Sequence, residues 1–344
     1  MILDDDPSGD WTQTGVFRCA ADVYRIPLPL PMDGLRAVNV YAMPDAEGWT
    51  LIDSGWALAQ SRELLAAALD ELGAGLGDVR RFLVTHVHRD HYTQAVALRR
   101  EFGGRVALGL GEKPGLDEVN RVDEHDAFQA QRSRLLRAGA HVLVETLAKL
   151  RPEPGDPSVW AAPDDWITDG EEIAVGPDRR LTAVETPGHT RGHLVFADDA
   201  AGLLFAGDHV LPRITPSIGF EPAPTANPLG AFLASLQLVR SRPDADLLPA
   251  HGPVGMRVHE RVDALLEHHG ARLDATLAAV REGRHSAFAV AEALTWTRHE
   301  RRLPELDPFN SMLAILETAA HLDVLVERGA VTVASQGGVA HYTT

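Results

Sequence analysis

The stretch THVHRDH, residues 85–91, follows the apolar run RFLV and holds three histidines and one aspartate. The apolar run predicts a β-strand. If that strand continues through His86 and His88, both imidazoles lie on one side, because side chains two residues apart in a strand point the same way. Asp90 and His91 then fall at the turn into a helix expected to begin near Thr93. Imidazole and carboxylate groups are ligands for Zn²⁺, and also for Fe or Mn. The stretch therefore predicts a metal site at a strand end.

Strand-like and helix-like segments alternate on both sides of this stretch, which predicts an α/β architecture. Segment 111–163 interrupts the alternation with a helical run, 126–150, and a Pro-rich tract. We interpret it as an insertion that lines or covers a site. The expected strands are 35–43, 48–55, 80–85, 105–109, 180–188, 192–198, 202–208 and 245–252, and the expected helices of the alternating part are 57–73 and 93–104.

Three further motifs place a polar side chain beside a glycine after a short apolar strand. They are TPGHT with His189, AGDH with Asp208 and PAHG with His251. Open α/β sheets bind ligands just beyond the ends of their strands. Four such motifs in one chain favour a shared metal site over a set of unrelated polar loops.

The ordered set His-x-His-x-Asp-His, Gly-His, Gly-Asp and His-Gly resembles the metallo-β-lactamase superfamily across residues 20–255. The motif LIDSG, which contains Asp53, matches that family as well. The resemblance implies an αββα sandwich with the metal site at one edge, between the sheets. It also implies a first metal site, a second metal site and a bridging ligand, formed respectively by His86, His88 and His189, by Asp90, His91 and His251, and by Asp208. This full set is typical of glyoxalase II and related lactonases and thioesterases, whereas true β-lactamases carry a cysteine.

The predicted activity is hydrolysis of a small thioester, ester or lactone with two zinc ions, with iron or manganese as substitutes. A paired metal site lowers the pKa of water toward about 7, and the resulting hydroxide attacks the acyl carbon. Asp90 is the catalytic candidate that orients this hydroxide or shuttles its proton. Asp53 and His209 are expected to support the ligands from behind, although Asp53 also suits a simple turn. The alternatives on the same fold are a mononuclear iron sulfur-dioxygenase, an endoribonuclease and a β-lactam hydrolase.

Four residues are candidates for substrate contact: Tyr92, Arg191, Arg213 and Phe220. Tyr92 follows Asp90-His91, where the family often has small residues, and either reaches the pocket or packs. Arg191 replaces a frequent proline and either binds a substrate carboxylate or lies on the surface. Arg213 and Phe220 belong to the loop 209–228, which follows Asp208 and is expected to wall the pocket.

The chain changes character near residue 256, so we expect a catalytic domain at 1–255 and a helical, winged-helix-like module at 256–344. Residues 257–344 contain nine Arg against twelve Asp and Glu, which argues against a nucleic-acid-binding role. We interpret the module as a packing unit that contributes to the pocket or to a homodimer contact.

The net charge of −17 disfavours polyanionic partners, because phosphate backbones are bound mainly by Lys and Arg. A small-molecule substrate is expected, with neither nucleic acid nor membrane as a partner. The single cysteine, Cys19, provides no internal disulfide, and the acidic N-terminus does not resemble a signal peptide. A cytoplasmic location is the simplest expectation.

Overall fold

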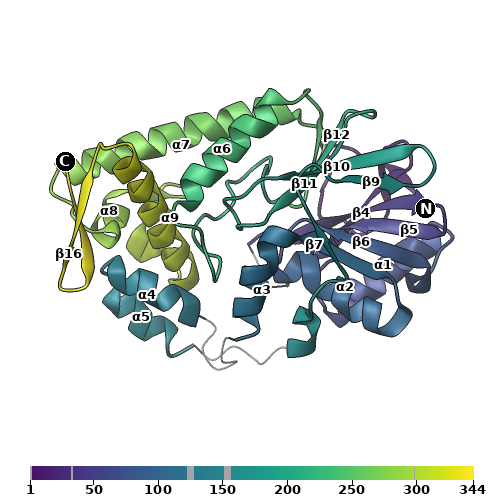
Figure 1. Ribbon diagram of the computed structural model, residues 1–344, viewed down its shortest axis with the longest axis horizontal. Helices are drawn as coiled ribbons and strands as arrows, with labels where there is room; N and C mark the ends of the chain where they lie inside the picture. The colour runs from purple at the N-terminus through teal and green to yellow at the C-terminus, as the bar shows by residue number, and fades with distance from the viewer. Residues whose placement is uncertain (1, 32–33, 122–127, 151–155, 298) are drawn as a thin grey trace.

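The computed structural model describes residues 2–31, 34–121, 128–150, 156–297 and 299–344. Its larger sheet has eight strands that lie side by side in the order β1 to β8, of which β4 to β7 are labelled in Figure 1. The pairs β5–β6 and β6–β7 are parallel, so the C-terminal ends of these strands meet at one edge. The strands are β1 (Leu3–Asp4), β2 (Phe17–Ala20), β3 (Val23–Pro29), β4 (Ala37–Asp45), β5 (Gly48–Ile52), β6 (Val79–Val84), β7 (Arg105–Gly109) and β8 (Asp165–Ile167).

The second sheet has five strands in the order β13-β12-β11-β10-β9. Apolar side chains of both sheets share one buried cluster, in which Tyr41 of the first sheet meets Phe205 of the second with ring centroids 5.4 Å apart. The two sheets therefore form a sandwich. The strands are β9 (Glu172–Val175), β10 (Arg179–Glu185), β11 (Leu194–Asp198), β12 (Leu203–Gly207) and β13 (Asp246–Pro249).

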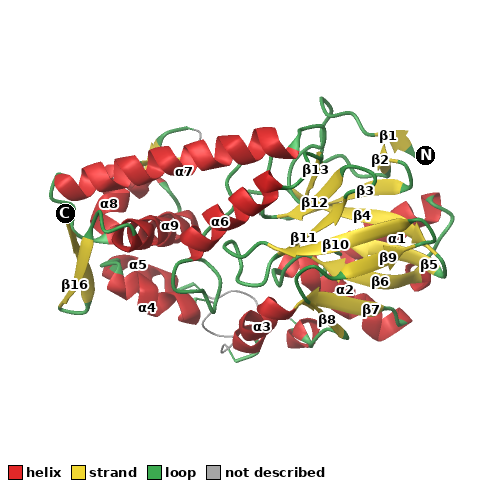
Figure 2. Cartoon of the chain, turned by 45° about the horizontal axis from the view of Figure 1, so that its top comes forward, coloured by secondary structure: helices red, strands yellow, loops and turns green. Residues whose placement is uncertain are grey.

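Helices cover the outer face of each sheet (Figure 2). On the first sheet, α1 (Ala59–Glu71) and α2 (Arg89–Phe102) bury their apolar stripes against strands β3 to β7. On the second sheet, α6 (Pro228–Ser241) packs Leu229, Phe232 and Leu236 against β10 to β13. This αββα layering is the architecture expected from the sequence.

The predicted insertion, 111–163, contains α3 (Lys113–Val119), α4 (Gln129–Arg137) and α5 (His141–Leu147), and β8 follows it. The helix expected over 126–150 is broken, because Gly139 adopts φ 88° between α4 and α5. Both helices share a hydrophobic cluster with α9, so this part of the insertion packs on the C-terminal helices. Residues 122–127 and 151–155 of the expected insertion lie outside the described residues.

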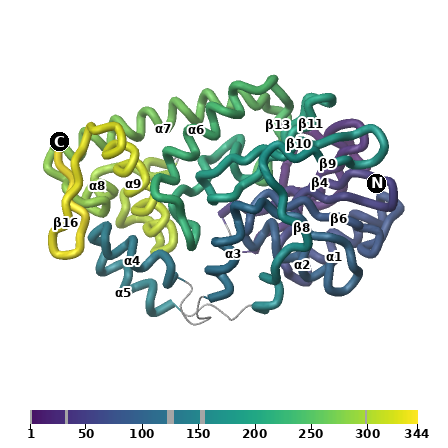
Figure 3. The backbone as a smooth tube through the Cα atoms, in the orientation of Figure 1, coloured from purple at the N-terminus to yellow at the C-terminus, as the bar shows by residue number. Residues whose placement is uncertain are grey.

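The C-terminal part consists of α7 (Val258–Arg281), α8 (Ala287–Ala293), the short pair β14 (Thr295–Trp296) and β15 (Arg301–Arg302), α9 (Pro308–Glu327), and the hairpin β16 (Thr332–Gln336) and β17 (Val339–Thr343). Helices followed by a hairpin match the expected helical module, and the backbone trace shows it beside α4 and α5 (Figure 3). Helix α9 is long and apolar enough to cross a membrane by composition alone, but it packs against α5 to α8 as a core helix. The domain boundary near residue 255 stays a prediction.

Candidate metal centre

The loop between β6 and α2 carries the first candidate ligands, but not as the sequence predicted. Strand β6 ends at Val84, so His86 and His88 lie in a bend rather than in a continuing strand. Helix α2 begins at Arg89 instead of near Thr93, which places Asp90 and His91 in its first turn. A carboxylate there interacts favourably with the positive end of the helix dipole. The helix start, rather than a strand register, sets the spacing of these side chains.

The structure brings all seven predicted ligands together from four separate segments of the chain. Ring nitrogens and carboxylate oxygens form two groups, and the donor atoms within each group lie within 4.8 Å of one another. The first group is His86, His88, His189 and Asp208, and the second is Asp90, His91 and His251.

Asp208 lies between the two groups, as expected of a bridging residue. Its Oδ2 is 3.4 Å from His189 Nε2 in the first group. Its Oδ1 is 3.3 Å from His251 Nε2 and 3.7 Å from His91 Nε2 in the second. On the other side of the second group, Asp90 Oδ2 is 3.4 Å from His251 Nε2 and 3.6 Å from His91 Nε2. Each oxygen of Asp208 therefore faces a different group.

Hydrogen bonds behind the rings fix which nitrogen carries the proton. His189 Nδ1 donates to the carbonyl of Ser217 at 2.8 Å, and His251 Nδ1 donates to the carbonyl of Ala37 at 2.7 Å. His91 Nδ1 donates to Asp53 Oδ2 at 2.8 Å. A neutral imidazole has one N–H, so in the neutral form of each ring the inward-facing Nε2 has a free lone pair.

The same reasoning applies to His86. The Thr85 hydroxyl donates to Asp53, so it accepts from His86 Nδ1 at 3.0 Å. The Nε2 lone pairs of His86 and His189 then point at Nδ1 of His88, at 2.9 and 3.0 Å. A single proton on His88 satisfies at most one of them. A cation at this point would satisfy all three nitrogens, so the donor set fits a metal ion.

The donor atoms of the second group also lack partners that a metal ion would supply. Within the described residues, His91 Nε2, His251 Nε2 and Asp208 Oδ1 are buried and have no hydrogen-bond partner. Buried polar atoms without a partner cost free energy, typically about 1–3 kcal/mol each, unless a ligand or water satisfies them. Three such atoms that face one point also fit a bound cation.

Charges and burial keep most of the donors ready for a cation near neutral pH. Burial, with the neighbouring His189, lowers the pKa of His88 to about 3, and burial holds the pKa of His86 well below its usual range. Burial also opposes protonation of His91, but the negative charges of Asp90, Asp53 and Asp208 outweigh it and raise the pKa to about 10. That negative charge also attracts a divalent cation, which would replace the proton.

Asp53, directly after β5, contacts the loop and one ring of the candidate site. It adopts φ 59°, a conformation that costs a non-glycine residue free energy. Its carboxylate accepts the backbone N–H of Thr85 at 2.8 Å through Oδ1 and the N–H of His91 through Oδ2. Asp53 therefore orients a ligand ring and ties down the loop that carries His86 and His88. A turn-forming role alone does not explain these bonds.

His193 is a supporting residue that the sequence analysis missed. Its buried Nε2 accepts the backbone N–H of Asp208 at 3.1 Å, and its Nδ1 pairs with the Thr186 hydroxyl at 2.9 Å. Gly207, before Asp208, has φ 49°, and an added Cβ would lie 2.6 Å from His193 Nε2. The signal was in the sequence, since GHTRGH repeats Gly-His four residues after His189.

Two other predicted residues lie behind the ligands. His209 is buried and packs its ring between His193 and Phe232, with centroids 6.1 and 5.1 Å away, so it supports the site through packing.

The structure corrects the prediction that Tyr92 is a candidate for substrate contact. Its side chain is buried in the core beneath the first sheet, and its hydroxyl donates to the carbonyl of Ala161 at 2.6 Å. Tyr92 packs rather than contacts substrate, because its position in α2 points it toward the core.

The remaining substrate candidates are Arg191, Arg213 and Phe220. Arg191 is half-buried, and its backbone N–H donates to Glu221 at 2.9 Å while its guanidinium donates to the carbonyl of Ala223 at 3.3 Å. Arg213 is exposed, and the ring of Phe220 lies 6.3 Å from that of His88. Substrate contact by these three residues stays a prediction.

A third group of donors, His268, His269 and Glu317, lies between α7 and α9. The buried His321 donates from Nδ1 to the carbonyl of Glu317 at 2.8 Å, so its Nε2 accepts from His269 Nδ1 at 3.2 Å. Burial raises the pKa of the Glu317 carboxyl, and the Arg272 guanidinium offsets only part of this increase. These contacts join two helices, and we interpret the group as a packing network.

The layered fold and the donors at its edge define a class of protein, the α/β metallohydrolases. The metallo-β-lactamase superfamily model matches residues 33–251, and the chain belongs to this superfamily. This family membership confirms the resemblance inferred from the motifs.

Similar proteins span nearly the whole chain. The probable metallo-hydrolase YqjP of Bacillus subtilis is 23% identical and covers 94% of this chain and 98% of its own length. A metallo-β-lactamase family protein of Thermus thermophilus, TTHA1429, is 30% identical, with a TM-score of 0.73 and coverage of 94% and 98%. A β-lactamase domain protein of Burkholderia ambifaria is 27% identical, with a TM-score of 0.80 and coverage of 99% and 98%. These coverages extend the similarity to the C-terminal helices. Together with the ligand groups, they support a metal-dependent hydrolase.

Proposed function

We propose that this protein is a binuclear zinc-dependent hydrolase of small thioesters, esters or lactones. The observation that carries the proposal is Asp208, whose two oxygens face two separate groups of donors. Five histidines and Asp90 complete these groups, and four of the histidines have their outward nitrogen engaged in a hydrogen bond, which leaves the inward nitrogen to face a cation. Iron or manganese is the alternative occupant.

A pair of divalent cations would supply Lewis acidity toward an acyl carbonyl and would acidify a water molecule. The protein's own contribution is orientation and proton transfer. Asp90 Oδ2 faces His91 and His251, and we assign the other oxygen to accept a proton from water and return it to the leaving group. Asp53 and His193 hold His91 and Asp208 in place during this transfer.

The proposal includes a small-molecule substrate, a cytoplasmic location and no nucleic-acid or membrane partner. The net charge of −17 supports a neutral or weakly charged substrate over a polyanion. We also propose a homodimer formed through the C-terminal helices, which analytical ultracentrifugation can test.

The test combines metal analysis with a substrate panel. Elemental analysis is expected to find two zinc ions per chain, whereas one iron would favour the sulfur-dioxygenase. The zinc-loaded protein is then assayed with thioesters, lactones, a chromogenic cephalosporin and RNA. Turnover of the cephalosporin or RNA alone would replace the proposal with a β-lactam hydrolase or an endoribonuclease.

Asp90→Ala ties any activity to the site. We expect turnover to fall by about 100-fold or more, as for the loss of a general acid or base. Asp70→Ala, at an exposed position of α1, is the matched control and should keep normal rates. Near-normal rates in Asp90→Ala with full metal content would refute the assigned role.

A further inference from the structure

A series of aromatic rings leads from the metal centre to the C-terminal helices. Phe220 lies with its centroid 6.3 Å from His88, Phe309 lies 5.6 Å from Phe220, and Phe128 lies 6.3 Å from Phe309. These spacings are typical of aromatic rings in contact. Phe309 is 41% exposed, and Phe220 and Phe128 are half-buried. The three residues, here called the aromatic strip, form a partly open apolar path that begins at a ligand.

The strip is assembled from three separate segments. Phe220 is in the loop after β12, Phe309 is the second residue of α9, and Phe128 directly precedes α4. Contacts join α4 with α9, and both views place these helices together in the C-terminal half of the molecule (Figures 1 and 2). The C-terminal helices and the insertion therefore supply two of its three rings.

Hydrogen bonds hold Phe220 firmly in this position. From α4, Gln131 donates to the carbonyl of Phe220 at 2.6 Å, and Arg134 donates to the carbonyls of Gly219 and Glu221. At the other end of the same loop, the carbonyl of Ser217 accepts from the ligand His189. The loop is thus fixed between the metal centre and α4. A ring held this way suits recognition better than a mobile side chain does.

We propose that the aromatic strip binds the apolar acyl part of the substrate, so that the preferred substrates are medium-chain or aromatic acyl esters and thioesters. This inference rests on the proposed hydrolase function and names its substrate class. Burial of an acyl chain against three rings releases water from apolar surface on both sides. The reacting carbonyl would then lie at the His88 end of the strip.

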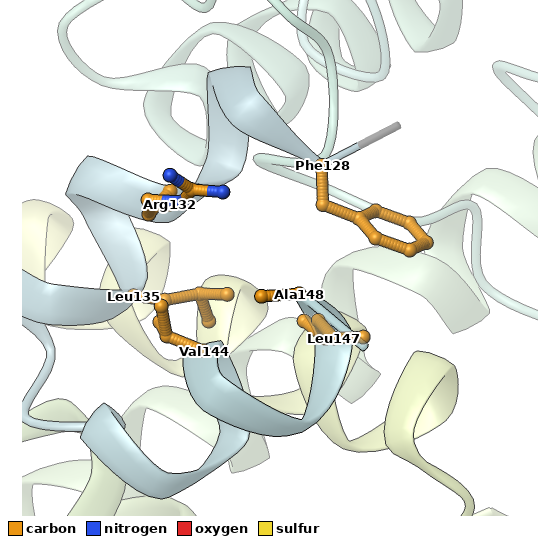
Figure 4. A pocket seen from close by; sticks show the side chains of 6 residues that line it. All are labelled: Phe128, Arg132, Leu135, Val144, Leu147 and Ala148. Atoms are coloured by element: carbon orange, nitrogen blue, oxygen red, sulfur yellow. The ribbon is translucent and has the colours of Figure 1, made fainter. Parts of the chain in front are cut away.

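The hollow at the far end of the strip is too small to hold the acyl group. It lies between α4 and α5 beside Phe128, and Leu135, Val144 and Leu147 line it (Figure 4). Its free volume of about 10 Å³ accommodates about one water molecule. The acyl chain is therefore expected to lie along the rings rather than to insert between the two helices.

Nucleobases also stack on exposed aromatic rings, so single-stranded RNA is the competing occupant. The net charge of −17 opposes a polyanion along this path. The observations favour an uncharged acyl chain, and RNA binding is one outcome of the test.

The experiment compares hydrolysis of p-nitrophenyl acetate, decanoate and 2-naphthoate by the zinc-loaded wild type, Phe309→Ala and Phe128→Ala. Phe102→Ala is the matched control, because Phe102 is 38% exposed at the end of α2 that lies away from the ligands. We expect kcat/KM for decanoate and naphthoate to fall by about 10-fold in the strip variants, with acetate nearly unchanged. Phe102→Ala should match the wild type.

The controls separate this inference from the proposed function. If all four proteins turn over acetate and show the same chain-length preference, the acyl-binding role of the aromatic strip is wrong, whereas the proposed hydrolase function still holds. If no ester is turned over, calorimetric binding of decanoate decides, and weaker binding in Phe309→Ala but not in Phe102→Ala supports the strip. Displacement of decanoate by a short RNA oligonucleotide would overturn it in favour of base stacking.

Discussion

Asp53→Asn is a sharp test of how the ligands are held, because the substitution keeps the size of a buried side chain and changes only its hydrogen bonding. The carboxylate accepts the Thr85 backbone N–H with one oxygen and the His91 N–H with the other. An asparagine has one oxygen and one NH₂ group. In the variant, either the Thr85 backbone N–H or the His91 N–H must therefore face the NH₂ group, which cannot accept a hydrogen bond.

The magnitude follows from the loss of one supporting bond behind a ligand. Changes of this kind typically weaken metal binding by about 10- to 100-fold, which corresponds to about 1.4–2.7 kcal/mol. If the amide oxygen stays with Thr85, His91 loses its acceptor and the second group, Asp90, His91 and His251, is weakened. The first group depends on Asp53 through the Thr85 backbone N–H, which keeps its acceptor in this case, and through the Thr85 hydroxyl, so it should change less.

A zinc titration against a chromophoric chelator measures both affinities. We expect the affinity of one site, the second group, to fall by about 10- to 100-fold. The affinity of the other site should stay within about threefold of wild type. Asp70→Asn, on the exposed face of α1, is the control for the change of charge. Unchanged affinities at both sites, with a normal unfolding midpoint, would refute the view that Asp53 orients His91.

Two further predictions concern Glu112 and Arg134, which lie outside the two donor groups. Burial raises the pKa of Glu112 to about 8, and its Oε1 contacts the Thr190 hydroxyl. The unfolded chain loses this proton near the ordinary pKa of about 4.3, so the free energy of unfolding falls as the pH rises from there to about 8. Glu112→Gln should remove roughly 3–5 kcal/mol of this pH dependence, as urea unfolding at pH 5 and pH 9 can measure. Equal pH dependence in both proteins would contradict the assignment. Arg134→Ala leaves the carbonyls of Gly219 and Glu221 without their donor and should lower stability by roughly 2–4 kcal/mol. A change within about 0.5 kcal/mol, the usual range for a neutral surface substitution, would show that α4 does not fix this loop.

Much of the fold could be predicted because the β-strands of the sandwich are short and apolar. The segments expected at 80–85, 105–109 and 202–208 correspond to β6, β7 and β12. Strands β1 to β3, β8 and β9 and helix α6 were not predicted. Helix α6 begins in the Pro-containing loop sequence that was expected only to wall the pocket. Its N-cap is Asn227, which accepts the backbone N–H of Gly230, and this local signal was available.

The ligand set was predictable because its residue types are rare together and recur after each strand. The geometry of His86 and His88 was not, since a strand and a bend give the same sequence spacing and only the start of α2 at Arg89 decides between them. His193 could have been found from the second Gly-His pair of GHTRGH, but it supports a ligand and is not itself a predicted ligand. Tyr92 was ambiguous because a residue after a ligand in a helix can face either the site or the core.

The sequence by itself determined the family and the layered α/β architecture. It also predicted the seven donor side chains, because metal ligation demands particular chemical groups at particular strand ends. Only the tertiary structure decided how those groups are held. The acceptors behind His189 and His251 are the backbone carbonyls of Ser217 and Ala37, and every residue has such a carbonyl. The tertiary structure alone also brought Phe128 and Phe309 to one path beside Phe220, because contacts between distant segments depend on packing and leave no local pattern in the chain.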